Sequence, residues 1–407
     1  MMSSVRLRRF IQPRLLDFGI RQISSATSTK LCSQLPSRSV LSVSGTDSKV
    51  FLNGIVASTI KDHPFYTTFL SAQASHVSII IRNILTVLLQ GRVLYDVFIY
   101  PHILDGRPAY LIDYDNRSSD ATPILALLKR HVLRSKVRIR DASNEWKVWS
   151  VWDSTSQGSS FPTVREWRTG RSGAVEPLYA EVEHQLGQEY PRDTVGTRDL
   201  RAPGMGDRLL VRAGDKPGVS CDVAQDETEF TLHRILHGVP EGRDDIVPQQ
   251  AFPMDSNMDL MGGLDFRKGC YVGQELTVRT YHTGVVRKRI MPVSLTLAPS
   301  PKTIQNPLEP NHSVPTLPVQ TSIQAERLAG ASPTNPDRPT RPRGTGTLLS
   351  NVHGLGLALL RLEHVEGVER GELVMSFAQM GDKGTESWIV LPKRPVWWPV
   401  ANNSTSV

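Results

Sequence analysis

Residues 265–275 read DFRKGCYVGQE, the densest cluster of unusual residues in the chain. Glycines stand on both sides of Cys270, and they permit strained backbone and the close approach of a partner. Arg267 and Lys268 precede the thiol, and a nearby cation favours the thiolate, which is the nucleophile and the metal ligand. These residues alone leave two interpretations open: Cys270 is a reactive thiol or metal ligand, or it is a small buried apolar side chain.

The next stretch predicts a β-hairpin that carries positive charge. Residues 276–280 alternate in polarity, residues 281–284 suit a turn with positive φ at Gly284, and residues 285–293 return. The basic side chains here are Arg279, Arg287, Lys288 and Arg289. They predict either a solvated hairpin face or a cradle for a carboxylate-rich ligand or an acidic partner.

Composition sets the class of protein. The 407 residues are 39% hydrophobic and 21% charged, which allows two or three globular domains and excludes a wholly disordered chain. Three cysteines, Cys32, Cys221 and Cys270, are too few for a disulfide framework and indicate a reducing compartment. No stretch has the ~18 consecutive apolar residues that a membrane span requires.

The N-terminus differs from the rest of the chain. Residues 1–30 are rich in Arg and Ser and hold six basic residues but one acid, Asp17. With interleaved apolar residues, this composition is typical of a mitochondrial transit peptide; the alternative is a plain basic tail. Because the formal net charge of the whole chain is +7, the remainder carries little excess charge. Nucleic-acid binding is therefore weakly supported.

The remainder predicts helices and strands without a regular βαβ repeat, hence an α+β fold. Strands are expected at 41–43, 66–70, 91–100, 148–153 and 209–212, and helices at 123–133 and 228–237. Residues 299–342 hold ten prolines and predict a disordered insertion with neither ladder nor helix. Beyond it, residues 346–362 and 387–391 predict strands of a small β module.

A family resemblance rests on Lys268-Gly269-Cys270-Tyr271-Val272-Gly273-Gln274-Glu275. This octapeptide resembles the K-G-C-[FY]-x-G-Q-E signature of the YgfZ branch of the glycine-cleavage T-protein (aminomethyltransferase) superfamily. Weaker matches in the family's order are residues 51–54, 91–96, 199–208, 279–289 and 354–361. The resemblance implies T-protein-like, folate-binding domains around a central channel, followed by a C-terminal β-barrel. The implied organisation is a transit peptide at 1–30, a core at 38–295, a proline-rich insertion at 296–343 and a barrel module at 344–398.

One segment departs from the family pattern. Family members usually run from Ala72-Gln73 straight into Gly91, whereas here residues 74–90 intervene. This segment is either a lineage-specific insert or a retained intron read as coding sequence. It would interrupt a strand connection near the channel.

The resemblance also implies site residues. In relatives the channel binds tetrahydrofolate. The implied catalytic residues are Cys270, Lys268 and Asp96, with Cys270 also a metal ligand. The implied cofactor-binding residues are Gly269, Tyr271, Gly273, Gln274, Glu275, Arg279, His282 and Arg208. T-proteins tend to carry paired acids where this chain has Tyr95-Asp96, so one carboxylate remains for acid chemistry at folate.

The mitochondrial branch implies a function in the matrix, in the late maturation of [4Fe–4S] proteins. Expected partners are A-type scaffold proteins, and expected clients are aconitase-type and radical-SAM enzymes. A cubane cluster needs about four thiolate-type ligands, so we expect a transient iron–sulfur cluster shared with a partner, with Cys270 as one ligand. The alternatives are a folate-dependent one-carbon transferase and a tRNA-modification accessory protein.

Overall fold

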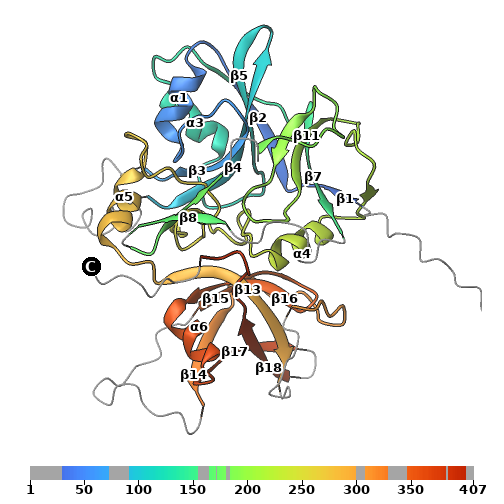
Figure 1. Ribbon diagram of the computed structural model, residues 1–407, viewed down its shortest axis with the longest axis vertical. Coiled ribbons are helices and arrows are strands. Elements are labelled where there is room, and N and C mark those ends of the chain that lie inside the picture. The colour runs from blue at the N-terminus through green and yellow to red at the C-terminus, as the bar shows by residue number, and fades with distance from the viewer. Residues whose placement is uncertain are drawn as a thin grey trace, which may run out of the picture.

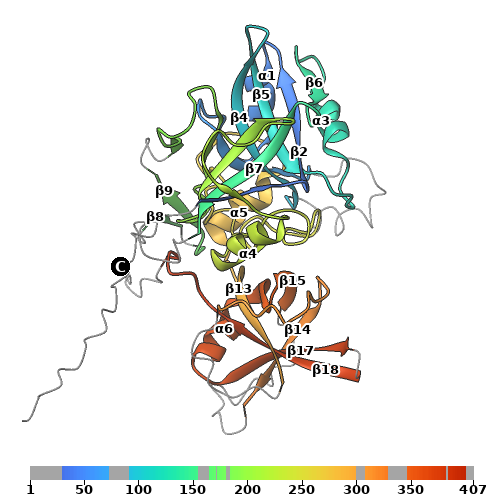
Figure 2. The same ribbon diagram turned by 90° about the vertical axis from the view of Figure 1, so that its right-hand side faces the viewer.

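A computed structural model describes residues 30–72, 91–154, 165–170, 172–179, 184–298, 308–328, 346–381 and 384–399. Within these residues, an upper lobe built on two five-stranded sheets sits above a closed barrel (Figures 1 and 2). The predicted transit peptide lies outside the described residues apart from Lys30, and so does the whole of segment 74–90. The mixture of helices and strands confirms the predicted α+β class and the C-terminal barrel.

The first sheet has the strand order β3-β4-β5-β2-β6, and helices α1 and α3 pack on one of its faces (Figure 1). Its elements are α1 (Ser48–Ile55), α3 (Ile124–Val132), β2 (Arg38–Ser44), β3 (Phe65–Leu70), β4 (Val93–Leu104), β5 (Arg107–Asp115) and β6 (Arg138–Asp141). The central strands are buried on both sides and rich in β-branched and aromatic residues, which pack well on a pleated surface. The strands predicted at 66–70 and 91–100 and the helix predicted at 123–133 are confirmed.

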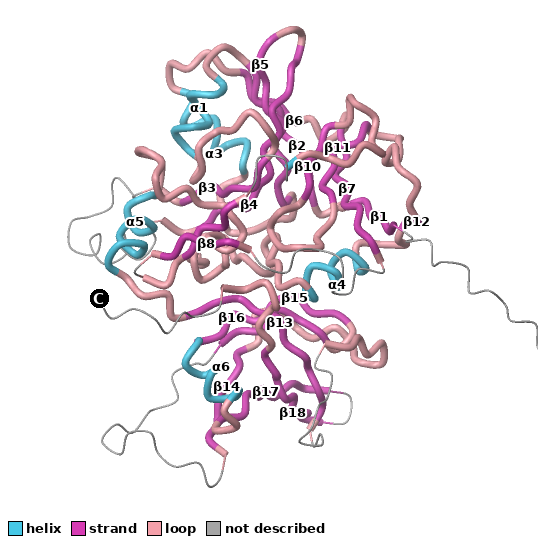
Figure 3. The backbone as a smooth tube through the Cα atoms, in the orientation of Figure 1, coloured by secondary structure: helices cyan, strands magenta, loops and turns pink. Residues whose placement is uncertain are grey.

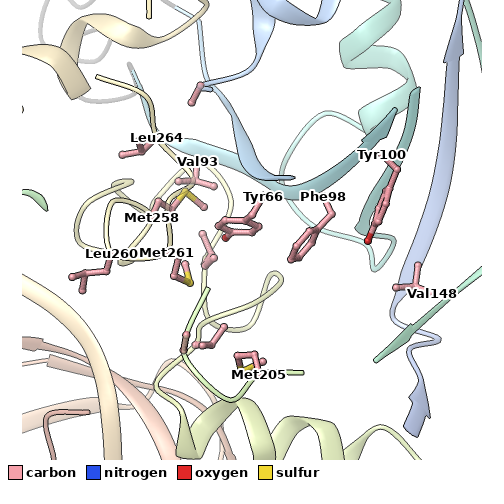
Figure 4. Close-up of a cluster of buried hydrophobic side chains, with 14 of the residues drawn as sticks. Tyr66, Val93, Phe98, Tyr100, Val148, Met205, Met258, Leu260, Met261 and Leu264 are labelled. Atoms are coloured by element: carbon pink, nitrogen blue, oxygen red, sulfur yellow. The ribbon is translucent and has the colours of Figure 1, made fainter. Parts of the chain in front are cut away.

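The second sheet has the order β10-β11-β7-β1-β12. Its strands are β1 (Lys30–Gln34), β7 (Trp146–Asp153), β10 (Val195–Arg198), β11 (Asp207–Arg212) and β12 (Asp222–Val223). One hydrophobic cluster joins this sheet to the first, because Tyr66, Phe98 and Tyr100 belong to the same buried group as Val148. Figure 4 shows that group, which Met258 and Met261 of an irregular loop complete.

Two smaller elements connect the lobe to the barrel. The ribbon β8 (Glu166–Thr169) and β9 (Val175–Leu178) lies near α5 (Gln274–Thr283), and α4 (Thr228–Leu236) lies over the barrel (Figure 3). Part of the packing of α4 is apolar, since Ile235 is fully buried and shares a cluster with Ile290 and Leu357. The helix predicted at 228–237 is confirmed, and its position ties the two parts together.

The barrel closes in the order β13-β16-β15-β14-β17-β18, with helix α6 beside it. Its elements are β13 (Lys288–Leu297), β14 (Ser322–Arg327), β15 (Gly346–Val352), β16 (Leu355–Arg361), α6 (Leu362–Glu369), β17 (Leu373–Gly381) and β18 (Gly384–Pro392). Strand β14 contradicts the prediction that residues 299–342 keep no ladder. The reason is local: residues 319–332 contain no proline, and Ile323 there is fully buried.

The predicted hairpin at 276–293 is also wrong. Residues Gln274–Thr283 form helix α5, and only β13 is a strand. The β-branched and aromatic residues of this stretch indicated strands, but Thr277 and Tyr281, four residues apart, lie on one side of a helix turn. Gly284 has a φ of −89°, so no positive φ is needed at that turn.

The small number of cysteines indicated a reducing compartment, but the structure contains one disulfide. Cys32 in β1 is joined to Cys221 by a disulfide across a Cα–Cα distance of 5.9 Å. The two residues are 189 positions apart, and no spacing rule connects them. Cys270 is the free cysteine.

Candidate functional site

The signature loop, which we define as residues 265–273, lies against the chain segment at the end of α1. The backbone N–H of Asp265 donates to the carbonyl of Ala57 at 3.2 Å, and that of Val272 donates to the carbonyl of Gly54 at 3.1 Å. The loop is therefore fixed at both ends to the same neighbour. Between these two ends, Gly269 and Cys270 are exposed.

Lys268 anchors the loop at its centre. Its ammonium group donates to the carbonyl oxygens of Val56 at 2.6 Å and Ser58 at 2.9 Å, and it lies 5.2 Å from the centre of the Tyr271 ring. Burial lowers the pKa of Lys268 to about 8. Because this amine is committed to two carbonyls, its clearest role is to hold the loop that carries Cys270.

The other side of the loop rests on α5 and on β9. The ring of Phe266 stacks on that of Tyr281 with centroids 4.0 Å apart. Glu176 accepts a hydrogen bond from the Tyr281 hydroxyl at 3.2 Å and from the Arg267 guanidinium at 3.3 Å. The second cation predicted to act on the thiol is therefore paired with a carboxylate.

The junction between the loop and α5 depends on Gly273. Its φ is +81°, and a β-carbon there would lie 2.7 Å from Leu70 Cβ and 2.7 Å from the carbonyl oxygen of Ser71. Only glycine combines this conformation with such a close approach. Beside it, the Gln274 side-chain oxygen accepts a hydrogen bond from the Tyr271 N–H at 3.2 Å. The glycine thus lets α5 begin directly against the end of β3.

Cys270 lies on the surface, at the projecting part of this anchored loop. A β-carbon built on the exposed Gly269 would meet nothing within 4 Å, while Tyr271 is only 6% exposed and fixes the following residue. The alternative of a buried apolar cysteine is therefore wrong. Three further predicted site residues lie exposed on α5: Glu275, Arg279 and His282.

Asp96 and Arg208, the remaining predicted residues, lie elsewhere, in a buried ionic network. Arg38 donates to Asp96 at 2.9 Å and to Asp113 at 2.6 Å. Arg208 contacts Asp113 at 2.9 Å and Glu241 at 3.1 Å. Asp96 is 3% exposed and Arg208 is 0% exposed. Among the described residues, the bonded partners of these two side chains all lie outside the signature loop.

The opposite charges of this buried network shift one another's pKa values. Burial raises the pKa of Asp96, although Arg38 opposes the change. Burial alone would also raise the pKa of Glu241, but Arg208, Arg201 and Arg38 hold it well below its ordinary value. The network is therefore one unit, in which each charged group depends on its neighbours.

Sequence reasoning missed several members of this network, including Arg38, Glu241, Arg201 and Asp113. They come from strands and loops far apart in the chain, and of these four only Arg201 stands in a segment that carried the family resemblance. The one available signal was the pair of segments Asp199-Leu200-Arg201 and Gly206-Asp207-Arg208, which hold a buried arginine each.

Comparison with known proteins places the chain in a family. It is 37% identical over 348 residues to the "Iron-sulfur cluster assembly factor IBA57 homolog, mitochondrial" of Cryptococcus neoformans, covering 82% of this chain and 84% of the relative. It is 34% identical to the protein of the same name from Mycosarcoma maydis, covering 94% and 89%. The chain belongs to the IBA57 family. This membership confirms the resemblance that the octapeptide around Cys270 indicated.

Two further comparisons agree with IBA57 membership. Residues 287–400 match the family model described as the CAF17 C-terminal beta-barrel domain, which corresponds to the observed barrel. The solved glycine cleavage system aminomethyltransferase T from Bartonella henselae matches with a TM-score of 0.53 at 11% identity, covering 91% of this chain and 86% of that one. This likeness confirms the T-protein-like fold. In the described part of the chain, no helix is long and apolar enough to cross a membrane.

Proposed function

We propose that the chain is a mitochondrial iron–sulfur cluster assembly factor in which Cys270 supplies one ligand to a cluster shared with a second protein. The names of its relatives support the general activity and the mitochondrial location. The observation that carries the proposal is the position of Cys270, exposed on a loop that is anchored on both sides.

The number of thiols supports a shared cluster. A cubane cluster needs about four thiolate-type ligands, and this chain has three cysteines. Cys32 and Cys221 are joined to each other, which leaves Cys270. Among the described residues, no group of three or more His, Cys, Asp and Glu side chains is arranged to hold a metal ion. The other ligands must therefore come from a partner, and we propose an A-type scaffold protein.

The proposal extends to the clients. A cluster held by one thiol of this chain and by thiols of a scaffold is exposed at the contact between two proteins, where a third protein can receive it. We propose [4Fe–4S] enzymes of the aconitase and radical-SAM classes as recipients. No observation favours the one-carbon transferase, since Asp96 is engaged by Arg38 and by the N–H of Gly242 inside the network.

The test is anaerobic cluster reconstitution of the full chain mixed with an A-type scaffold. Visible absorption is measured on the complex after gel filtration. We expect Cys270→Ser to lose the cluster absorption of the complex while its far-ultraviolet circular dichroism stays that of the parent chain. The matched control is the double variant Cys32→Ser/Cys221→Ser, which keeps Cys270 and should keep the cluster. Equal absorption per complex in the parent chain and in Cys270→Ser would refute the ligand role.

A cellular assay tests the client proposal separately. Cells depleted of the endogenous protein are supplied with the parent chain or with Cys270→Ser, and aconitase activity and protein lipoylation are measured. The parent chain should restore both, and the variant neither. Full rescue by the variant would contradict the proposal, even if the purified complex binds a cluster.

A further inference from the structure

The fold implies a cofactor that the described residues do not fit. The family resemblance assigns tetrahydrofolate to the centre of the upper lobe, with Asp96 and Arg208 among its contacts. Both side chains are buried and bonded to other side chains of the chain itself. We infer that the centre of this chain takes no folate, because its own arginines and carboxylates fill the position that the resemblance assigns to the ligand.

The cavities beside Asp96 are small. The cavity lined by Tyr66, Phe98 and Arg201 has a volume of about 20 Å³. A second cavity, lined by Tyr95 and Asp96, has about 10 Å³. Sites for small molecules and cofactors usually measure ~300–1,000 Å³. The larger of the two volumes suits a single water molecule, which would also serve the Tyr66 hydroxyl, a group that no described residue bonds.

The aromatic faces in this region are already covered. The guanidinium carbon of Arg201 lies 4.9 Å from the centre of the Phe98 ring and 5.4 Å from that of Tyr66. The guanidinium of Arg208 lies 5.3 Å from the Phe98 ring centre. A flat heteroaromatic ring binds by stacking on such faces, and here two arginines of the chain stack instead.

The charged groups of this region are paired with one another in the same way. Arg201 contacts Asp199 at 2.7 Å and Glu241 at 2.6 Å, and Arg208 contacts Glu241 and Asp113. A ligand that entered here would have to separate these pairs and leave charges buried without partners, which is strongly unfavourable. The lack of space and the cost of separating buried ion pairs therefore both exclude the ligand.

Larger cavities flank α4, with volumes of about 440 and 490 Å³. Arg38 and Glu241 of the buried network line the second cavity, but Asp96 and Arg208, which the resemblance assigns to folate, line neither of them. The first is mainly apolar, with Trp152 and Trp397 in its walls. The size of these cavities therefore does not restore the implied folate site.

The inference is tested by titrating the full chain with 5-formyltetrahydrofolate, a stable tetrahydrofolate, in an isothermal calorimeter. A glycine-cleavage aminomethyltransferase serves as the positive control in the same buffer. We expect no saturable heat and no shift of the thermal unfolding midpoint up to about 1 mM ligand, while the control binds. One-to-one binding below that concentration overturns the inference.

A second measurement separates this inference from the proposed function. The cluster-bearing complex with the scaffold is assembled with and without 5-formyltetrahydrofolate. We expect the same cluster absorption in both, and a folate-dependent increase would also overturn the inference. The Cys270→Ser experiment tests the thiol alone. The ligand role of Cys270 and the absence of folate binding can therefore each fail without the other.

Discussion

Replacing Arg208 with methionine should strongly destabilise the upper lobe. Methionine keeps much of the length of the side chain but removes its contacts with Asp113 at 2.9 Å and Glu241 at 3.1 Å. Breaking a buried ion pair from one side costs about 3–5 kcal/mol, because the remaining charge has no solvent. Asp113 keeps Arg38 and Glu241 keeps Arg201, so we expect the lower end, a loss of about 3 kcal/mol in the free energy of unfolding.

The loss should also depend on pH. The network holds three arginines and four carboxylates, and the variant would leave two arginines facing the same four carboxylates. A carboxylate that loses its arginine has a raised pKa in the folded state. The folded variant then binds more protons than the unfolded chain above pH ~4, so its stability falls as the pH rises. The destabilisation should therefore be larger at pH 8 than at pH 5.

Urea unfolding followed by tryptophan fluorescence measures this effect, because β7 carries Trp146, Trp149 and Trp152 and pairs directly with β11, the strand of Arg208. The control is Arg140→Met, which removes a partly exposed pair with Glu145 in the same lobe. We expect that control to cost no more than about 1 kcal/mol. An Arg208→Met loss below about 1 kcal/mol, or one equal to the control, would refute the reasoning that the network is a structural unit.

Three further predictions follow from single features. Gly273→Ala should cost about 2 kcal/mol in unfolding free energy, since its β-carbon would lie 2.7 Å from the Ser71 carbonyl oxygen at positive φ; a neutral result in urea unfolding would contradict this. Burial holds the pKa of His233 well below 6.5, so as the pH falls the unfolded chain takes up the proton before the folded chain does. The free energy of unfolding should therefore fall by about 2 kcal/mol between pH 7 and pH 5. His233→Phe should flatten that part of the pH profile, and an unchanged slope would exclude this residue as its cause. Removal of residues 74–90 should leave the free energy of unfolding within about 1 kcal/mol of the parent chain's, because the Gly91 N–H already donates to the Ser71 carbonyl at 3.2 Å; an insoluble product would show that the segment is needed.

The parts of the fold that were predictable are those whose local pattern and tertiary environment agree. Helix α3 has a proline at its start and an apolar side, and β7 is rich in valine and tryptophan, so each formed as expected. The stretch that forms α5 was predicted as a strand at 276–280 and a turn at 281–284, because β-branched and aromatic residues usually favour strands. The stacking of Tyr281 on Phe266 and the left-handed Gly273 outweighed that preference, and neither is visible from composition.

The candidate site was predictable only around the octapeptide. The exposure of Cys270 was one of two alternatives that the residues left open, and the fold decided between them. Lys268 was expected to act on the thiol, yet its charge goes to the carbonyls of Val56 and Ser58. A charged residue does not reveal its partner when that partner is a backbone carbonyl about 210 positions away.

The separation of the thiol from the buried network bears on how a transferase fold can serve cluster assembly. A ligand enclosed by one chain needs a cavity at the centre, whereas a cluster shared by two chains needs a thiol that a second protein can reach. In this chain the centre is closed by Arg201 and Arg208, and the reachable thiol is at the surface. The anchoring of the signature loop then has a direct benefit, because a loop that is already ordered loses less conformational entropy when a partner binds. On this reasoning, the closed core matters to function by holding one sulfur atom in place, and loosening the loop should weaken partner binding even where Cys270 itself is retained.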